Sequence, residues 1–414
     1  MRKQIWALGA ILFSMSLYIM GNGLIGVLIP VRASLEHFSN LALGVIGSFY
    51  FAGFVIGCFA GPRLLVRAGH SRVFGIGAGI SAASILLQSM FVSEFVWILM
   101  RGAFGLAAAC IYMVIESWLN DRASNENRGR IFSVYLTVNF SSIIVGQMMF
   151  GTAGPKTFVL FSTAAILYAL SLIPMGLTRL PPPHAAHVPV LRPRRLYGIS
   201  PVGVMGCIAV GFANSAVWTL SPVYAQAHGL NKGWIAIFMS VFTLGGALIQ
   251  LPLGRLSDRM DRRIIIAFVC VAAAAIGIAL ATFGGAHRWT ILPLIGLFGT
   301  VALPLYGLSV AHTNDRVARE EFVETSATLL FINSLSSVGG PTLAALVMGW
   351  FGTSALFFYT AAIHVAMAAF TVVRIGIKER APVLTRERYE AVPQQSTAME
   401  AELDPRAAEE KTAA

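Results

Sequence analysis

The chain has 414 residues, of which 56% are hydrophobic and only 12% are charged. Soluble domains carry about 25% charged residues, so half that share over this length excludes an ordinary water-soluble fold. The net charge of +11 would suit a nucleic-acid-binding protein, but the basic residues are scattered through short loops, which argues against a basic binding face. The four cysteines, Cys58, Cys110, Cys207 and Cys270, lie in apolar runs without metal-ligand spacing, and we interpret them as buried apolar side chains.

Twelve apolar runs are long enough to cross a membrane as helices, which takes about 20 residues each. They lie approximately at 5–30, 41–62, 73–92, 95–119, 131–151, 157–178, 200–224, 234–255, 264–285, 289–312, 323–348 and 353–376. The first run is too long for a signal-peptide core and has no small-residue cleavage site, so we expect it to be retained. The pattern predicts an all-α integral membrane protein with twelve transmembrane helices.

Lysine and arginine positions predict the orientation of these helices. If both termini lie on one side, the loops of the other side contain only Arg32, Lys156, Lys232 and Arg288. Arg101 lies within a helix, and the remaining 25 of the 30 basic residues fall on the side of the termini. Because basic residues are concentrated in cytoplasmic loops, we expect both termini in the cytoplasm.

Two segments lack long apolar runs. The sequence "RLPPPHAAHVPVLRPRRLYGIS" is rich in proline and arginine and predicts a cytoplasmic linker at 181–199. The stretch after Ile377 is polar and mixed in charge, which is typical of a disordered tail, here 379–414. The chain therefore divides into an N-terminal six-helix bundle at 1–180, the linker, a C-terminal six-helix bundle at 200–378 and the tail.

The two halves are related by an internal duplication. With a shift of 194, Gly102, Phe104, Gly105, Ala108, Tyr112, Asn120, Asp121 and Arg122 recur as Gly296, Phe298, Gly299, Ala302, Tyr306, Asn314, Asp315 and Arg316. The glutamate between the repeated tyrosine and Asn-Asp-Arg, Glu116, is not repeated. Glycines and polar residues in register across several helices are not expected by chance. They predict two repeats related by pseudo-two-fold symmetry, with a solute site at their interface near the midplane.

The loop sequence "GRLSDRMDRR" at 254–263 resembles the cytoplasmic motif of the major facilitator superfamily. The matching residues are Gly254, Leu256, Asp258, Arg259, Arg262 and Arg263, and Asp261 stands where that motif usually has glycine. In the first half, "GPRLLVRAGHSR" keeps Arg67, Gly69 and Arg72, but Val66 replaces the acid. Arg101, Gly105 and Ala107 fit an intramembrane pattern of the family. The sequences "VIES", "NRGR", "PLGRLSD" and the Gly-Gln at 146–147 are most similar to the YcaD-like bacterial branch.

This resemblance covers roughly residues 1–378. It implies two six-helix bundles, a location in the bacterial inner membrane and transport of a small solute by alternating access without a cofactor. It also implies a cytoplasmic gate, for which the candidates are Asp258, Arg259, Arg262 and Arg263 with Asp121, Arg122, Asp315 and Arg316. Asp258 would brace the bundles in one access state. Because Val66 stands at the first-half position, we expect Asp258 to fill this role on one side only.

Two ionisable residues stand out within the apolar runs, Arg101 and Glu116. Such groups destabilise insertion by around 2.5–3.5 kcal/mol at a helix centre. At 100° per residue both share one stripe of the fourth helix with Tyr112, but about 22 Å along the axis separates them, so they cannot pair. The resemblance places this stripe on the cavity. Arg101 either contacts a substrate anion or a charged partner, or bonds to backbone carbonyls.

Three interpretations of Glu116 stay open. It lies about one turn from the polar Asn-Asp-Arg, so it can belong to an ion-pair network with Arg122 or Arg128. It can instead carry a coupling proton, because a carboxylate in a cavity can bind and release one. A direct contact with substrate is the third possibility.

Duplicated polar and aromatic residues complete the candidate site. The asparagine pairs can bind solute at the pseudo-symmetry axis or merely hold helices together, and the repeated tyrosines can serve packing. Trp218 is one turn from its neighbouring asparagine and can share its face. These candidates are Asn22, Asn214, Asn139, Asn333, Trp218, Tyr112 and Tyr306.

Other motifs are rejected. "GNGLIG" at 21–26 matches a dinucleotide pattern but lies mid-helix without a preceding strand. No phosphate-binding loop occurs, which excludes ATP-driven transport within this chain. We expect a monomeric, proton-coupled secondary transporter of an anionic or zwitterionic small molecule, without metal, cofactor, nucleic-acid partner or enzymatic activity. A proton-independent facilitator or exporter, and a scaffold or sensor built on the same fold, remain alternatives.

Overall fold

The computed structural model describes residues 2–124, 127–177, 183, 190–284, 287–318, 321–377, 389, 391 and 396–403. Within these ranges the secondary structure is helical, without a strand. Twelve helical segments are long and apolar enough to cross a membrane. The prediction of an all-α membrane protein with twelve spans is therefore confirmed.

The helices follow the predicted runs closely. The first half contains α1 (Arg2–Leu35), α2 (Asn40–Ala68), α3 (His70–Met90), α4 (Glu94–Arg122), α5 (Arg128–Met149), η1 (Phe150–Thr152) and α6 (Val159–Leu177). In the predicted linker lies α7 (Pro193–Ile199). The second half contains α8 (Pro201–Ala227), α9 (Lys232–Arg259), α10 (Arg262–Phe283), α11 (Arg288–Ala302), α12 (Leu305–Asn314), α13 (Phe322–Phe351) and α14 (Ala355–Gly376), and α15 (Ala398–Leu403) follows in the tail.

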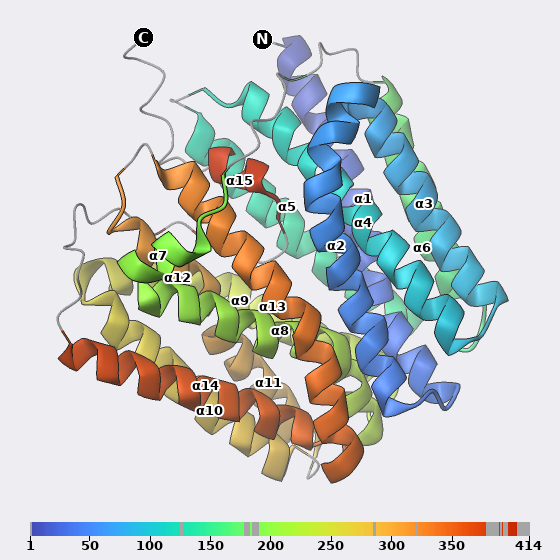
Figure 1. Cartoon of the computed structure of the whole chain (residues 1–414). Helices are drawn as coiled ribbons and strands as arrows, with labels where there is room; N and C mark the ends of the chain where they lie inside the picture. The colour runs from blue at the N-terminus through green and yellow to red at the C-terminus, as the bar shows by residue number, and fades with distance from the viewer. Residues whose placement is uncertain are drawn as a thin grey trace.

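The two halves form two bundles that stand side by side, α1–α6 in blue to green and α8–α14 in light green to red-orange in Figure 1. Because the twelve spans cross alternately, α1 begins and α14 ends at the same face of the molecule. We call this the terminal face and the opposite one the distal face. The long helices place one end of every span at each face, so depth in the molecule can be counted along a helix at 1.5 Å per residue.

Repeated glycines set the same helix contacts in both halves. Gly53 of α2 lies so close to the carbonyl of Gly102 on α4 that a Cβ atom would collide with it. Gly245 of α9 meets Gly296 of α11 in the same way. Small residues allow transmembrane helices to approach closely. The duplication thus encodes one helix-packing pattern twice.

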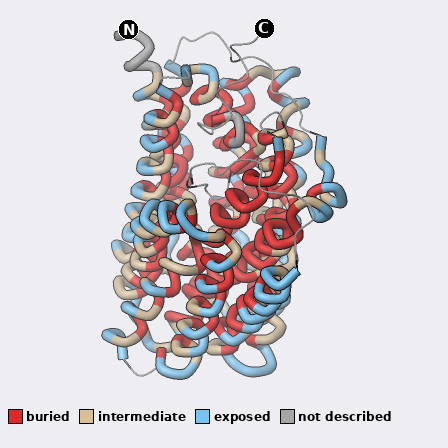
Figure 2. The backbone as a smooth tube through the Cα atoms, turned by 90° about the vertical axis from the view of Figure 1, so that its left-hand side faces the viewer, coloured by how far each residue is buried: buried red, intermediate tan, exposed pale blue. Residues whose placement is uncertain are grey.

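The outer surface of the bundles is apolar. Large exposed side chains such as Phe13, Ile56 and Phe268 point away from the core, and Figure 2 shows helices that are buried towards the interior and exposed outside. At the distal end of α11, the Arg288 guanidinium lies 5.2 Å from the ring of Trp234. Tryptophan and basic side chains at a helix end are typical of a membrane–water interface.

The tenth span is broken, although the sequence predicts one continuous helix there. It consists of α11 and α12, with Leu303 and Pro304 in a turn between them. Proline has no N–H to donate to the preceding turn and its ring clashes with that turn. The position equivalent to Pro304 in the first half is Cys110, and α4 is continuous there.

The two bundles are joined directly in the distal half. The hydroxyls of Ser48 on α2 and Thr342 on α13 lie 2.7 Å apart. The side-chain amide of Gln147 on α5 donates to the hydroxyl of Thr243 on α9 at 3.1 Å. In the terminal half, α15 lies between the bundles and packs against α4 and α13 (Figure 1).

The expectation of a disordered tail does not hold for the part of 379–414 that the structure describes. Tyr389, Ala391 and residues 396–400 are largely buried, as is Leu403. The tail is poor in apolar residues, but Tyr389, Met399 and Leu403 supply enough apolar side chain to pack against the helices. The rest of the predicted tail lies outside the described residues.

Candidate functional site

A cavity of about 150 Å³ lies between the two bundles, lined by α1, α2, α4 and α5 of the first half and by α8, α9 and Leu303 of the second. This is far more than the ~10–15 Å³ that one water molecule needs. Most lining side chains are apolar or aromatic. The polar ones are Asn22, Tyr50, Arg101, Tyr112, Asn139, Gln147, Thr219 and Gln250. A mostly apolar cavity with a few converging polar groups is typical of a small-molecule site.

Arg101 is the charged side chain among the described residues that line this cavity. Its guanidinium carbon lies 4.7 Å from the ring centre of Tyr50 and 5.3 Å from that of Phe104. Such cation–π contacts are worth about 0.5–2 kcal/mol each. Within the described residues, Nε and Nη1 of Arg101 have no hydrogen-bond partner. The aromatic rings therefore hold the cation in place and leave donors for an anionic group.

Five of the predicted site residues come together at this cavity: Arg101, Tyr112, Asn22, Asn139 and Trp218. The side-chain oxygen of Asn22 accepts a hydrogen bond from the hydroxyl of Tyr168 at 3.1 Å, which fixes the amide orientation. The Trp218 ring packs edge-on against Phe242. These side chains form polar and aromatic walls around Arg101.

The other duplicated candidates lie elsewhere. The Asn214 amide donates to the carbonyl of Ala302 at 3.0 Å and so joins α8 to α11. Asn333 is buried within α13, and Tyr306 is buried in the core of the second bundle. None of the three lines the cavity. Each asparagine pair thus places one member on the cavity and the other inside the second bundle.

Sequence reasoning missed Tyr50, Gln147 and Gln250, which line the cavity. Their repeat-related positions hold Phe242, Pro341 and Cys58, so a search for duplicated polar residues passes over them. The signal that identifies them is an uncharged polar side chain within an apolar run. The repeat-related residue in the other half is apolar. The charged side chain of Arg101 likewise has an apolar counterpart, Ile295.

Glu116 lies on the terminal side of the cavity and is fully buried. The hydroxyl of Tyr135 donates to one carboxylate oxygen at 3.1 Å. The backbone amide of Thr397 donates to the other at 3.0 Å, and the Thr397 hydroxyl donates to the same oxygen. Arg122 pairs instead with the adjacent Asp121, at 3.5 Å. In the described part of the chain, the partners of Glu116 are therefore a tyrosine and the tail rather than a basic side chain.

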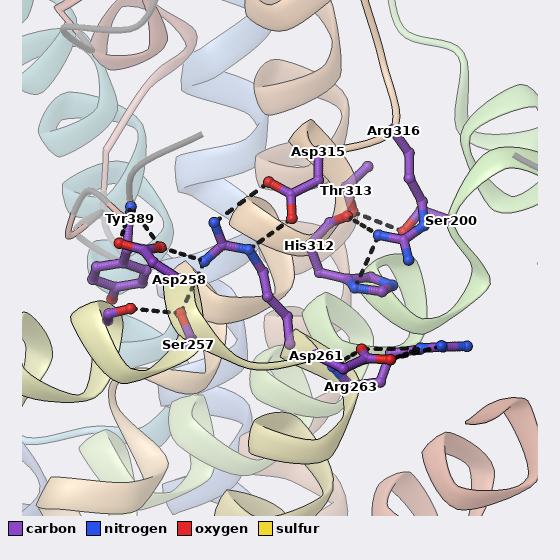
Figure 3. A network of polar contacts seen from close by, with 12 residues as sticks. Ser200, Ser257, Asp258, Asp261, Arg263, His312, Thr313, Asp315, Arg316 and Tyr389 are labelled. Atoms are coloured by element: carbon purple, nitrogen blue, oxygen red, sulfur yellow. Dashed lines mark hydrogen bonds and ion pairs between the residues drawn. The ribbon is translucent and has the colours of Figure 1, made fainter. Parts of the chain in front are cut away.

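Three of the predicted gate residues, Asp258, Arg262 and Asp315, meet in the second bundle. Nε of Arg262 lies 2.8 Å from Asp315, and Nη1 lies 3.0 Å from Asp258. Nη1 also donates to the hydroxyl of Ser257 at 2.8 Å (Figure 3). Because Arg262 and Asp315 are both buried, removing Arg262 would leave the Asp315 carboxylate without its ion-pair partner, which is strongly destabilising.

The other gate candidates of the second bundle are Arg263, Arg316 and Arg259. Arg263 pairs with Asp261 at 2.7 Å, and Figure 3 shows this pair beside the network. Partial burial opposes ionisation of Asp261, but hydrogen bonds and charge from Arg263 outweigh it and hold the pKa of that carboxyl below its usual value. Arg316 donates to the carbonyl of His312 at 2.8 Å, and Arg259 is exposed.

The repeat-related positions of the first half do not hold the residues of this acid–arginine–acid network. The repeat places Val66 where Asp258 stands and His70 where Arg262 stands, while Asp121 corresponds to Asp315. Val66 is exposed and His70 is buried against the Trp118 ring. The described contacts of Asp258 are moreover to Arg262 and to the tail, so they do not cross to the first bundle.

A search of the described ranges for groups of three or more metal-ligating His, Cys, Asp or Glu side chains finds none. The cavity walls likewise offer amides, hydroxyls and one guanidinium rather than a set of ligands. The arrangement is suited to holding a solute through hydrogen bonds, ring contacts and one positive charge.

A sequence model described as Major Facilitator Superfamily matches residues 11–318 and 204–398. An uncharacterized MFS-type transporter of Enterobacter sp. strain 638 is 25% identical over 359 residues, covering 85% of this chain and 92% of the relative. The uncharacterized MFS-type transporter YcaD of Escherichia fergusonii is 23% identical over 361 residues, with the same two coverages of 85% and 92%. The relatives thus include the branch that the sequence motifs indicate.

Solved structures share the fold at low identity. The nucleoside transporter NupG superposes with a TM-score of 0.75 at 12% identity, covering 91% of this chain and 100% of that chain. A bacterial homolog of the human lysosomal transporter Spinster, in an inward-facing and occupied conformation, gives a TM-score of 0.75 at 15% identity, with coverages of 95% and 100%.

Proposed function

Since the chain belongs to the major facilitator superfamily and is a transporter, we propose that it carries a small anionic or zwitterionic solute by proton-coupled alternating access. The observation that supports this most directly is the cavity between the bundles with Arg101 in its wall. Solute would enter from one face, bind between the bundles and leave through the other.

Arg101 supplies the recognition of charge. An arginine carries five N–H donors and cannot be deprotonated in proteins, and two of its nitrogens have no partner within the described residues. A carboxylate or similar anion accepts these donors, and hydrogen bonds to charged groups contribute about 1.5–3 kcal/mol each. The apolar wall and the amides of Asn22 and Asn139 would hold the uncharged part of the solute.

Alternating access would require the distal contacts to open. Ser48–Thr342 and Gln147–Thr243 are neutral hydrogen bonds between the bundles. A typical hydrogen bond of this kind stabilises by only about 0.5–1.5 kcal/mol net. Contacts of this strength can form and break in each transport cycle as the bundles rock about the cavity.

Proton coupling would use Glu116. The carboxylate is buried one helical turn from the cavity residue Tyr112 and is held by hydroxyl and amide donors. A protonated carboxyl offers fewer acceptor sites than a carboxylate, so proton uptake would weaken these bonds. A change in protonation can therefore change the packing at the terminal side of the cavity.

The terminal face would be cytoplasmic and the membrane the bacterial inner membrane. The support for this is the concentration of lysine and arginine in the loops of that face, because such an excess marks cytoplasmic loops. A monomer suffices, since both bundles that enclose the cavity come from one chain.

The test is uptake by the purified full chain in liposomes with an imposed pH gradient. Labelled anionic, zwitterionic and cationic solutes are compared, and nucleosides are included because a nucleoside transporter shares the fold. We expect gradient-driven uptake of an anionic or zwitterionic solute, and Glu116→Gln should retain binding but lose stimulation by the gradient. Glu94→Gln, at the other end of α4, is the matched control and should behave as the parent chain.

Three outcomes would contradict parts of the proposal. Uptake at the same rate with and without the pH gradient indicates a proton-independent facilitator. Unchanged coupling in Glu116→Gln excludes this carboxyl as the proton carrier. Absence of uptake and of binding across the whole panel favours the scaffold or sensor alternative.

A further inference from the structure

The described part of the tail is buried between the two bundles. We call Tyr389, Ala391 and residues 396–403 the tail plug. Tyr389, Thr397, Met399 and Leu403 are each at most 4% exposed. A polar segment that follows the last membrane span would be expected to stay in water, so its burial needs specific contacts.

The first bundle supplies contacts to the later part of the plug. Both the backbone amide and the hydroxyl of Thr397 donate to Glu116. Met399 and Leu403 belong to the apolar cluster that includes the core of the first bundle. The short helix α15 packs against α4 on one side and α13 of the second bundle on the other.

The second bundle supplies contacts to the earlier part of the plug. The backbone amide of Tyr389 donates to both carboxylate oxygens of Asp258, at 3.0 and 3.1 Å. The Tyr389 ring lies against Gly254 of α9 and Gly307 of α12 so closely that a Cβ at either glycine would collide with it. Figure 3 shows Tyr389 beside Asp258 in this position. The two glycines thus form a seat for one aromatic ring.

The plug lies one helical turn beyond the cavity on both bundles. Tyr112 lines the cavity on α4, and Glu116 follows four residues later towards the terminal face. Gln250 lines the cavity on α9, and Gly254 follows four residues later in the same direction. Four residues are about one turn, or 6 Å. The plug therefore covers the terminal end of the cavity from both sides.

We propose that the terminal half of the passage between the bundles is a binding site for this chain's own C-terminal segment. The plug occupies the site with Thr397 on Glu116 and Tyr389 on Asp258 and the glycine seat. It closes the cavity towards the terminal face and has to leave before solute can pass there. Because the segment is tethered to α14, its effective concentration is high and modest contacts suffice. The inference rests on the proposed transport function only in that closing the passage matters to a chain that passes solute through it.

The test measures access to the cavity without measuring transport. In the full chain, Cys58, Cys110, Cys207 and Cys270 are replaced by alanine and Gln250→Cys serves as reporter. A membrane-impermeant maleimide is applied from the side of the termini. The double substitution Met399→Glu with Leu403→Glu makes burial of the plug unfavourable, because buried unpaired charges are strongly disfavoured. Tyr389→Asp is a second variant that acts at the other end of the plug.

The matched control is Val190→Glu with Ile377→Glu, which adds the same charge at side chains that are 51% and 47% exposed. We expect labelling of Gln250→Cys at least ~10-fold faster in a plug variant than in the parent, the factor that ~1.4 kcal/mol produces. Faster labelling in either plug variant, absent from the control, supports the plug. Unchanged labelling in both plug variants overturns it.

Uptake of solute by the same variants separates the two proposals. If labelling accelerates but no solute is transported by any variant, the proposed function fails and the plug stands. If the parent transports solute while labelling stays unchanged in both plug variants, the transport function stands and the plug fails.

Discussion

Arg101 and Glu116 share one stripe of α4, yet they have opposite kinds of neighbours. Arg101 is held by aromatic rings and keeps donors without a partner in the described chain. Glu116 has its acceptors filled by Tyr135 and Thr397. The Arg101 donors without a partner can bind a ligand reversibly. The filled acceptors of Glu116 instead form an intramolecular contact.

Arg101→Gln should lower uptake of the transported anion by ~10–100-fold, because hydrogen bonds to a charged group contribute about 1.5–3 kcal/mol. Arg101→Lys should lower uptake less, since lysine keeps the positive charge but lacks the planar set of donors of arginine. Uptake rates at subsaturating solute measure both. Arg288→Gln is the control, because Arg288 also lies over two aromatic rings but outside the cavity. Equal losses in Arg288→Gln would refute a binding role for Arg101.

Asp315→Asn should destabilise the second bundle because it leaves the buried Arg262 with one acidic partner fewer. Breaking a buried pair costs about 3–5 kcal/mol, and we expect the lower end because Asp258 remains 3.0 Å from Arg262. Thermal unfolding in detergent measures the effect. Asp121→Asn, the repeat-related change, should alter stability by at most ~1 kcal/mol, because its 3.5 Å pair with Arg122 is partly exposed. Similar effects of the two substitutions would contradict this account.

At the scale of helices, the sequence predicts where spans lie but not how each one is shaped. Pro30, Pro62 and Pro222 all lie inside continuous helices, whereas Pro304 lies in the turn between α11 and α12. A proline in a helix interior removes one hydrogen bond, and the packing around it decides whether the helix also breaks. That packing involves residues from other helices, so no local pattern reveals it.

Pro304→Ala should make the tenth span more continuous, because alanine restores the N–H that the turn lacks. If the break serves as a hinge next to the cavity residue Leu303, the maximal uptake rate should fall while thermal stability stays equal or rises. Pro293→Ala, within the intact helix α11, is the control and should leave the rate nearly unchanged. A Pro304→Ala chain that transports at the parental rate would show that the break is not a hinge.

At the scale of the whole molecule, the duplication was the most productive sequence signal. It predicts two bundles, and the repeated glycines make equivalent contacts in each. It was a poorer guide to the cavity, since Asn214, Asn333 and Tyr306 are repeated but lie away from it. Residues that are repeated in both halves serve helix packing. A solute contacts different residues in the two halves, so the residues that bind it need not be repeated. The bond between Glu116 and Thr397 spans 281 residues, and nothing local in the sequence indicates it.

A cross-link between Ser48→Cys and Thr342→Cys should arrest transport, because it holds the two bundles together in the distal half, where the native hydroxyls lie 2.7 Å apart. Uptake in a chain without the native cysteines, before and after reduction, measures the block and its reversal. The control pair is Ser200→Cys with Thr313→Cys, whose native hydroxyls lie 3.2 Å apart within the second bundle. Full activity of the cross-linked Ser48–Thr342 pair would refute rocking of the two bundles.

The contact between the tail and Glu116 also has a consequence for how the protein is made. Glu116 leaves the ribosome 281 residues before Thr397, which at 5–20 residues per second is a delay of roughly 14–56 s. Throughout this time the first bundle can insert and fold, but Thr397 is not yet present to donate to the Glu116 carboxylate. The residues that cover it are translated after those of both bundles. If the tail closes the passage as proposed, closure has to follow synthesis of both bundles, and a chain that stopped after α14 would reach the membrane with both bundles and without the plug.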